Sequence, residues 1–257
     1  MTLSGAELGT AVGSFFWPFI RISAMFIAAP ILGTRMIPVR IRVLLAVVLT
    51  VVVAPLLPPV SVVDVLSPAG VLVVVQQVLI GLTMGFILQM VFSALVMAGE
   101  QMAFSMGLGF ASMVDPQNGV TVPVVSQFFT LIATLLYLAM DGHVVLIEVL
   151  VQSFFSVPVA GIGLTADAFW TVVSWGGQMF LYAVHIALPV VASLMLVYIS
   201  LGVMTRAAPQ LNIFSVGFPL TLLVGFITIM LFMQVFAAGF EFILFSGFDL
   251  IRSVMGV

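Results

Sequence analysis

The side chains that could carry out catalysis are few and widely spaced. The two histidines are His143 and His185, and Glu148 stands five residues after His143. Two metal ligands on one helix face are usually three or four residues apart, so this spacing does not favour a metal site. His185 lies in an apolar stretch, where it is either bonded to a neighbouring helix or part of a proton relay. We therefore expect a protein that is not an enzyme.

Sequence patterns that hold cofactors are also missing. There is no HExxH, no GxSxG and no glycine-rich nucleotide-binding loop. The chain has no cysteine, which excludes disulfides, Cys-ligated zinc and iron–sulfur clusters. All six basic residues are arginines and they form no patch that could follow a phosphate backbone. We expect no cofactor, no metal and no nucleic acid partner.

Two charged residues stand in apolar surroundings and could serve a partner. Arg21 lies inside an apolar segment, where a buried arginine is costly unless it meets acceptors or an aqueous cavity. The alternatives for Arg21 are an ion pair or carbonyl clamp within the chain, and a contact with another subunit. Among these we assign Arg21, together with Glu100, to subunit contacts.

The composition of the whole chain is that of an integral membrane protein. Of 257 residues, 63% are hydrophobic and 6% are charged. Charge-free stretches run over Val65–Gly99, Ala168–Thr205 and Ala207–Phe240. A continuous helix over Ala168–Thr205 would be about 57 Å long, whereas the hydrocarbon core of a bilayer is about 30 Å thick. Either these helices break, or they continue past the lipid into a protein assembly.

Six main apolar segments can be recognised along the chain. They cover residues 12–32, 43–57, 69–98, 124–140 (followed by a shorter run over 144–155), 168–204 and 218–250. We expect the fifth to be interrupted at Pro189. This pattern predicts an all-α membrane protein built from long, broken helices and helical hairpins.

The distribution of charge predicts an orientation. Residues 33–42 hold three of the six arginines, and Arg206 follows the fifth segment. Connections 58–68 and 141–167 hold acidic but no basic residues. The positive-inside rule then places residues 33–42 and 205–217 in the cytoplasm and both termini outside. The first ten residues lack the positive region of a signal peptide, so we expect the first segment to be retained.

The connection Gly99–Gly119, with the sequence GEQMAFSMGLGFASMVDPQNG, is apolar where a solvated loop would be polar. Its glycines bend at low steric cost, and methionine adapts to irregular shapes. Non-helical backbone at membrane depth is tolerated only if it is buried or lines a cavity, so two alternatives stand: a deformable pore plug, or a re-entrant loop in the protein core. The candidate plug residues are Met102, Phe104, Met106, Gly107, Leu108, Gly109, Phe110 and Met113.

A second polar island covers Arg206–Ser215, with the sequence RAAPQLNIFS. Pro209 and Asn212 favour a tight hairpin between two long helices. The alternative is a solvated surface loop.

With these segments in view, the sequence resembles the FliR/SctT family of type III secretion export-gate subunits. The resemblance covers essentially the whole chain. It is most specific over Phe19–Leu45 (FIRISAMFIAAPILGTRMIPVRIRVLL), Gly99–Gly119 and Arg206–Leu220 (RAAPQLNIFSVGFPL).

The resemblance implies a helical hetero-oligomer with FliP-like and FliQ-like subunits, next to FlhB-like and FlhA-like export components. It implies a FliP-like part over about residues 1–167 and a FliQ-like helical hairpin over about 168–257. The assembly would sit in the bacterial inner membrane within the flagellar basal body and project towards the periplasm.

The resemblance also assigns roles to residues. The plug of the family corresponds to about Met106–Met113, and the cytoplasmic hairpin tip to Arg206, Pro209, Gln210, Asn212 and Phe214. Because Ile213 and Phe214 follow Asn212, we expect an apolar rather than a charge-based contact with a FlhB-like partner at the tip. The predicted function is a gating subunit that passes unfolded flagellar axial proteins. The alternative is a small-solute transporter with about six spans.

Overall fold

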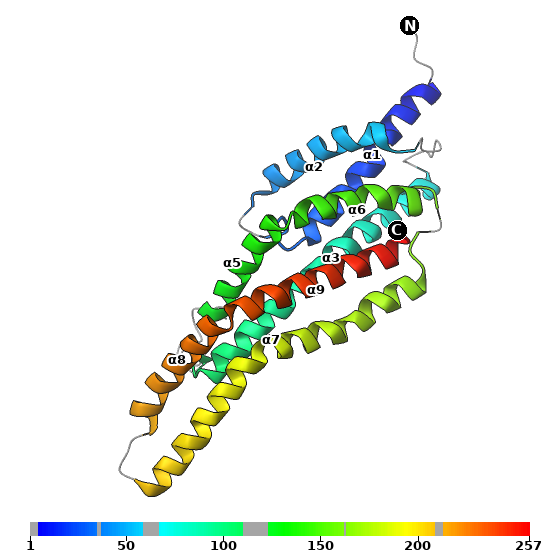
Figure 1. Cartoon of the computed structure of the whole chain (residues 1–257). Coiled ribbons are helices and arrows are strands. Elements are labelled where there is room, and N and C mark those ends of the chain that lie inside the picture. The colour runs from blue at the N-terminus through cyan, green and yellow to red at the C-terminus, as the bar shows by residue number, and fades with distance from the viewer. Residues whose placement is uncertain (1–4, 35–36, 59–66, 110–122, 162, 209–212) are drawn as a thin grey trace. The chain divides into compact units, whose positions relative to one another are not determined.

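A computed structural model of the chain describes residues 5–34, 37–58, 67–109, 123–161, 163–208 and 213–257. Helices account for nearly all of these residues, and no strand occurs among them (Figure 1). This confirms the expectation of an all-α protein. The helices are α1 (Gly5–Ala28), α2 (Val39–Val53), the 3₁₀ helix η1 (Ala54–Leu56), α3 (Pro68–Ser105), α5 (Val124–Ala139), α6 (Gly142–Ser156), α7 (Ala166–Ala207), α8 (Ile213–Leu231) and α9 (Met233–Met255).

The two longest helices do not break. α3 has 38 residues and α7 has 42. The expected interruption at Pro189 is wrong, because α7 continues through this residue. Proline removes a single backbone donor, and apolar helices tolerate it where neighbouring groups satisfy the freed carbonyl.

The sixth apolar segment, in contrast, consists of two helices. α8 ends at Leu231 and α9 begins at Met233, with Phe232 in a turn between them. Backbone hydrogen bonds of 3.0 Å from Phe232 N to Thr228 O and of 2.9 Å from Phe236 N to Phe232 O bridge this point. The chain therefore changes helix here without a proline or glycine.

The fourth segment bends sharply. α5 and α6 meet at an angle of 64° around Asp141, which has a φ of 54°. Aspartate is one of the few non-glycine residues that tolerate this left-handed conformation, so the charged residue fits the turn.

By length and composition, four helical stretches among the described residues could cross a membrane: Val39–Leu56, Pro68–Ser105, Ala166–Ala207 and Met233–Met255. The bent pair α5–α6 would make a fifth. The apolar parts of α1 and α8 are shorter. The expected arrangement of six ordinary spans therefore exceeds what these helices offer.

The chain divides into two compact units. The first comprises Met1–Met90, Leu138–Gly176 and Leu244–Val257. In this unit α1 crosses α3 at very short range. A Cβ atom on Gly81 would lie 2.3 Å from Arg21 O, and one on Gly85 would lie 2.6 Å from Ala28 Cβ. Glycine is required at both positions because backbone and side chain of α1 occupy the space of a Cβ.

The second unit comprises Val91–Tyr137 and Gly177–Ile243. Aromatic rings fill its interior. Phe129 and Phe236 lie 4.6 Å apart between ring centroids, and Phe92 meets both Tyr137 and Phe240 edge-to-face at about 6 Å. The division at residue 167 into a FliP-like and a FliQ-like part is a statement about resemblance to other subunits. The two compact units do not test it, and it stays a prediction.

Candidate functional site at the end of helix α3

The last turn of α3 ends in a defined C-cap. Gly107 has a φ of 87°, a conformation that side chains other than glycine rarely adopt. Gly107 N donates to Phe104 O at 3.0 Å and Leu108 N donates to Ala103 O at 2.9 Å. These two bonds form a Schellman motif, which satisfies carbonyls that a helix end leaves without partners. Gly107 therefore fixes the point where α3 stops.

Helix α8 packs against this cap. A Cβ atom on Gly225 would lie 2.6 Å from Met106 Cγ, and one on Gly107 would lie 3.2 Å from Cδ2 of Phe218. Met106 is completely buried. The glycine of α8 thus provides the space into which the methionine of α3 fits.

Two hydroxyl groups bind the last carbonyls of α3. Thr221 Oγ1 lies 3.1 Å from Met106 O and 3.0 Å from Phe218 O of its own helix, so its one proton is shared between these two carbonyls. Tyr198 Oη donates to Ser105 O at 2.8 Å. Thr221 is on α8 and Tyr198 is on α7. The end of α3 is therefore held by two helices that follow it by about 100 residues in the sequence.

The expectation that Gly99–Gly119 is a loop is wrong for its first part. Residues Gly99–Ser105 belong to α3, and only Met106–Leu108 form a turn. Gly99 does not bend the chain, because α3 continues through it. A Cβ atom on Gly99 would lie 2.6 Å from Ser126 Cα of α5. Ser126 Oγ donates to Val96 O at 3.1 Å across the same contact. Gly99 therefore serves close packing of α3 on α5, and the helix continues through it.

The predicted plug residues divide into four groups. Met102, Met106 and Gly107 are buried in the second unit, whereas Phe104 has 60% of its surface exposed. Leu108 and Gly109 are half-buried. Phe110 and Met113 lie outside the described residues. The structure thus brings Met102, Met106 and Gly107 together in the interior and leaves Phe104 at the surface.

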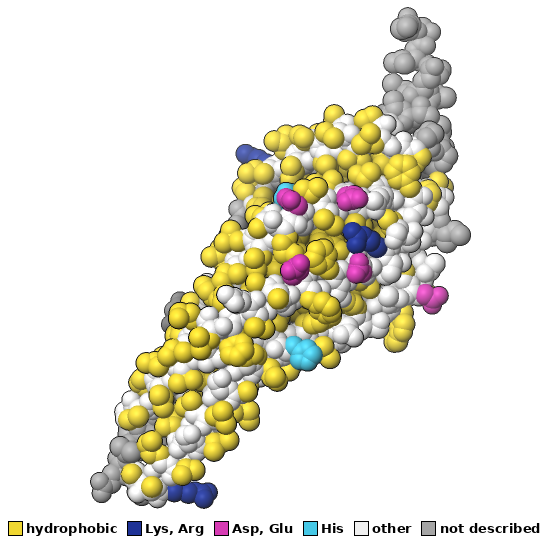
Figure 2. Space-filling view, in the orientation of Figure 1, with side chains coloured by type: hydrophobic (Ala, Val, Ile, Leu, Met, Phe, Trp, Pro, Cys, Tyr) yellow, Lys and Arg dark blue, Asp and Glu magenta, His cyan; other side chains and the backbone are white. Residues whose placement is uncertain are grey.

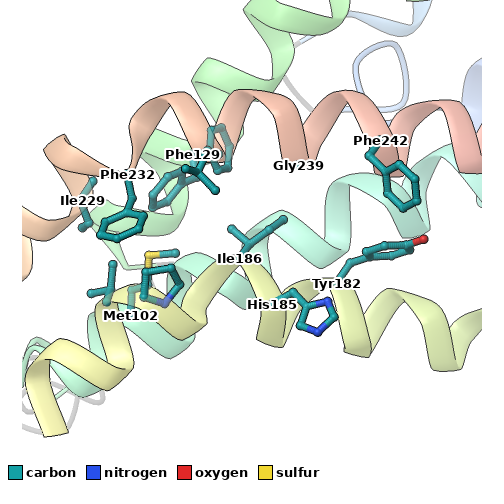
Figure 3. A pocket seen from close by; sticks show the side chains of 13 residues that line it. Met102, Phe129, Tyr182, His185, Ile186, Ile229, Phe232, Gly239 and Phe242 are labelled. Carbon is teal, nitrogen blue, oxygen red and sulfur yellow. The ribbon is translucent and has the colours of Figure 1, made fainter.

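Two apolar pockets adjoin this region. One of about 280 Å³ is lined by Met102 and by residues of α5, α7, α8 and α9. Figure 3 shows Phe129 and Phe232 at one end of it and Tyr182 and Phe242 at the other, with Ile186 between. The second, of about 610 Å³, is lined by Leu108 together with Val124, Val125, Phe128, Phe226, Ile229, Met230 and Met233. Leu108 and Val124 stand just before and just after the connection 110–122.

Catalytic or metal-binding chemistry finds no support in this part of the chain. The side chains that line both pockets are apolar except for Tyr182 and His185. Across the described residues, no group of three or more His, Asp or Glu side chains could hold a metal ion. Hydrophobic side chains cover most of the face in Figure 2.

Comparison with known proteins identifies the family. The family model described as bacterial export proteins, family 1, matches residues 12–246. The chain belongs to this family. Flagellar biosynthetic protein FliR of Pectobacterium carotovorum subsp. carotovorum is 37% identical over 255 residues, covering 99% of this chain and 97% of that protein. FliR of Escherichia coli K12 is 38% identical over 241 residues, covering 94% and 92%. FliR of Bacillus subtilis 168 is 35% identical over 228 residues, covering 86% of both chains.

In this member of the bacterial export proteins, family 1, Arg21 is completely buried and bound within its own chain. Its Nε donates to Gln77 Oε1 at 2.7 Å, Nη1 donates to Ser153 O at 2.8 Å and Ser153 Oγ at 3.0 Å, and Nη2 donates to Val157 O at 2.8 Å. The guanidinium also lies 4.0 Å from the ring centroid of Phe154. This geometry is the carbonyl clamp that the sequence analysis gave as one alternative for Arg21. The assignment of Arg21 to a subunit contact gains no support from this geometry and stays a prediction.

The remaining predicted site residues are only partly described. Glu100 is half-buried, and its side chain forms no hydrogen bond or ion pair within the described part of the chain. Arg206 is exposed in the last turn of α7, and α8 begins at Ile213, as a helical hairpin requires. Pro209, Gln210 and Asn212 lie outside the described residues, as does the side chain of Phe214. The role of the tip as a partner contact stays a prediction.

Sequence reasoning missed the residues that hold the end of α3. Tyr198, Thr221 and Gly225 lie in stretches that are uniformly apolar, and nothing in their spacing relates them to Met106. Gly107 could have indicated the end of α3 from the sequence, because a glycine that follows an apolar helix and precedes another hydrophobic residue is typical of a helix C-terminus.

Proposed function

We propose that this chain is a gating subunit of the flagellar protein export apparatus, through which unfolded axial proteins cross the inner membrane. The observation that carries the proposal is the length of exposed apolar surface on α7. Large apolar side chains are exposed from Trp170 to Val203, which corresponds to about 50 Å along a helix. The hydrocarbon core of a bilayer covers only about 30 Å. The rest of this surface needs protein partners.

The family membership and the names of the relatives indicate which apparatus supplies these partners. FliP-like and FliQ-like subunits would cover the exposed faces of α7 and α8, and FlhB-like and FlhA-like components would stand at the cytoplasmic side. The hairpin tip between α7 and α8 would meet the FlhB-like partner. Such an assembly would extend from the inner membrane towards the periplasm, inside the basal body.

The seal of the pore would be built on the end of α3. Residues Met106 and Gly107 form a fixed anchor, since the cap, Thr221 and Gly225 hold them. Phe104 is exposed next to this anchor, and Phe110 and Met113 follow it in the sequence. Unbranched and aromatic apolar side chains can close around a hydrated path and exclude ions, yet move aside for a polypeptide. We assign the sealing role to Phe104, Leu108, Phe110 and Met113, and the anchoring role to Met102, Met106 and Gly107.

A pair of matched variants tests the sealing role. Phe104→Ala shortens an exposed aromatic side chain beside the anchor, whereas Phe155→Ala shortens one of similar exposure (57% against 60%) on α6. Ion leak is measured in cells that contain assembled export gates but no substrate. The Phe104 variant should leak and the Phe155 variant should not. Equal leak in both, or wild-type tightness in Phe104→Ala and in a Phe110→Gly/Met113→Gly variant, would reject the seal.

The need for partners is tested first, by native mass. The chain is extracted in mild detergent after expression with and without the neighbouring membrane proteins. The proposal expects a discrete hetero-oligomer that contains this chain and fails to form without it. A stable monomer that is indifferent to those proteins would favour a small-solute transporter instead.

A further inference from the structure

Helix α2 exposes apolar side chains around most of its circumference. Its buried residues are Ala46, Thr50 and Val53, which form one narrow stripe along the helix. Outside this stripe Val47 and Leu49 are half-buried, and the other large apolar side chains are exposed: Val39, Ile41, Val43, Leu44, Leu45, Val48, Val51 and Val52. Such a surface needs an apolar environment around most of the helix. Whether lipid or protein provides this environment depends on the length of the helix.

The length of α2 matches a bilayer and nothing longer. The candidate span Val39–Leu56 has 18 residues, or about 27 Å of helix with Arg40 and Arg42 in its first turn, against about 30 Å of hydrocarbon. The helices α3 and α7, with 38 and 42 residues, are about twice as long as the hydrocarbon core of a bilayer is thick. Of these three, α2 is the one that lipid can cover completely.

Positive charge stands at one end of this apolar surface, and no carboxylate in the described part of the chain pairs with it. Arg40 is exposed, and Arg42 is half-buried with Nη2 donating to Thr34 O at 3.0 Å. Neither forms a salt bridge among the described residues. Between residues 8 and 63 the sequence contains no acidic side chain at all, whereas Arg35 adds a third positive charge. An anionic group from outside the chain can therefore approach the exposed Arg40 without competition from a described carboxylate.

We propose that α2 is the helix through which this chain contacts lipid, and that Arg40, supported by Arg42, binds the phosphate of an anionic phospholipid. The guanidinium group is planar and offers paired donors that match phosphate oxygens. The acyl chains of the same lipid lie along the exposed face of α2. The anionic lipid therefore neutralises the arginines and covers the apolar side chains at once. This inference does not require a sealing role for the end of α3.

The first experiment measures lipid affinity. The detergent-solubilised complex is titrated with fluorescent phosphatidylglycerol or fluorescent phosphatidylcholine. Wild type should bind phosphatidylglycerol more tightly, and Arg40→Gln should weaken that binding about fivefold per charge removed, with phosphatidylcholine unaffected. Arg40→Lys, which keeps the charge, should lose less affinity for phosphatidylglycerol than Arg40→Gln does. Arg252→Gln is the matched control, because Arg252 is a surface arginine paired with Asp249 at 3.1 Å.

Two results would overturn the lipid site. One is an equal affinity of the wild-type complex for both lipids. The other is a loss in Arg252→Gln as large as that in Arg40→Gln, which would indicate a general charge effect.

The second experiment asks what covers α2. Because the chain has no cysteine, Val48→Cys and Ile199→Cys each give a single site for a spin label. In vesicles of equal parts phosphatidylcholine and phosphatidylglycerol that contain the assembled complex, the label on α2 should be mobile and readily relaxed by oxygen. A label at residue 48 that is immobile and shielded from oxygen would mean a protein cover, and the inference would be wrong. A label at residue 199 on α7 that is accessible to oxygen would count against the proposed assembly instead.

Discussion

The side chain of Met106 occupies the space that any side chain at Gly225 would need: a Cβ atom there would lie 2.6 Å from Met106 Cγ and 2.9 Å from its Sδ. The contact joins the end of α3 to the middle of α8 inside one compact unit. Because Met106 also carries the carbonyl bound by Thr221, a displacement of this residue disturbs the hydrogen bond and the packing together.

Gly225→Ala should therefore destabilise the chain. Overpacking of a tight interior costs about 1–3 kcal/mol, and the methionine cannot leave without losing its buried contacts. Met106→Ala should relieve the clash, so the double variant should lose less than the sum of the two single variants. The measurement is the thermal unfolding midpoint in detergent. Gly202→Ala is the control, because nothing lies within 4 Å of a Cβ at that helical glycine; a similar loss there would contradict the packing argument.

Gly107→Ala should lower the free energy of unfolding by about 1–2 kcal/mol for a different reason, because residue 107 has a left-handed conformation with a φ of 87°. Gly107→Asn should lose less, because asparagine tolerates this region better. Equal losses for alanine and asparagine would mean that contact with Phe218, and not backbone conformation, decides the effect.

The contrast between Gly99 and Gly107 shows how far the sequence predicts this region. Both glycines stand in the same apolar stretch, and sequence reasoning treated them alike as points of bending. Gly107 does end the helix, but Gly99 allows α5 to approach α3 and the helix continues through it. A residue type states what a backbone can tolerate, whereas the distant partner that uses this freedom, here Ser126, is decided by tertiary packing.

The presence and type of the long helices were predictable, because charge-free apolar runs of this length have few other solutions. Their breaks were not. Proline favoured an interruption at Pro189, which α7 does not show, and no residue type marks the break at Phe232. For Arg21, the sequence indicated a residue in need of partners. It could not indicate Gln77, Ser153 and Val157, which lie 56 to 136 residues away.

Arg21→Lys should be strongly destabilising although it keeps the charge. Lysine lacks the planar fork, so it cannot reach Gln77 Oε1, Ser153 O and Val157 O at once. Each buried acceptor left without a donor costs about 1–3 kcal/mol. Arg252→Lys is the control, since the exposed pair with Asp249 is worth only about 0–1 kcal/mol. Comparison of thermal midpoints decides the matter; similar midpoints for both variants would speak against the clamp.

Gly81→Ala should disturb the same unit through the backbone. The added methyl group would lie 2.3 Å from Arg21 O and 2.9 Å from Met25 N, so α1 has to move away from α3. Neither atom belongs to a flexible side chain, and the cost should reach at least the about 1–3 kcal/mol that is typical of overpacking. Protease resistance of the extracted chain reports the loosened helix pair. Gly177→Ala, with open space around its Cβ, should leave resistance unchanged.

The hydroxyl groups of Tyr198 and Thr221 offer the sharpest test of whether the anchor of α3 serves the gate. Tyr198→Phe and Thr221→Val keep the size of each side chain and remove its hydrogen bond to Ser105 O or Met106 O. Each loss should cost at most about 1 kcal/mol, because Tyr198 is exposed and Thr221 shares its proton with Phe218 O. This is too little to prevent assembly, but it loosens the point from which the proposed seal extends. We expect the double variant to assemble at normal native mass and to leak ions in cells. Tyr182→Phe, on the same helix but away from the α3 end, provides the comparison. A double variant that assembles and stays as tight as wild type would separate the anchor from the seal and leave the Schellman cap a purely structural feature.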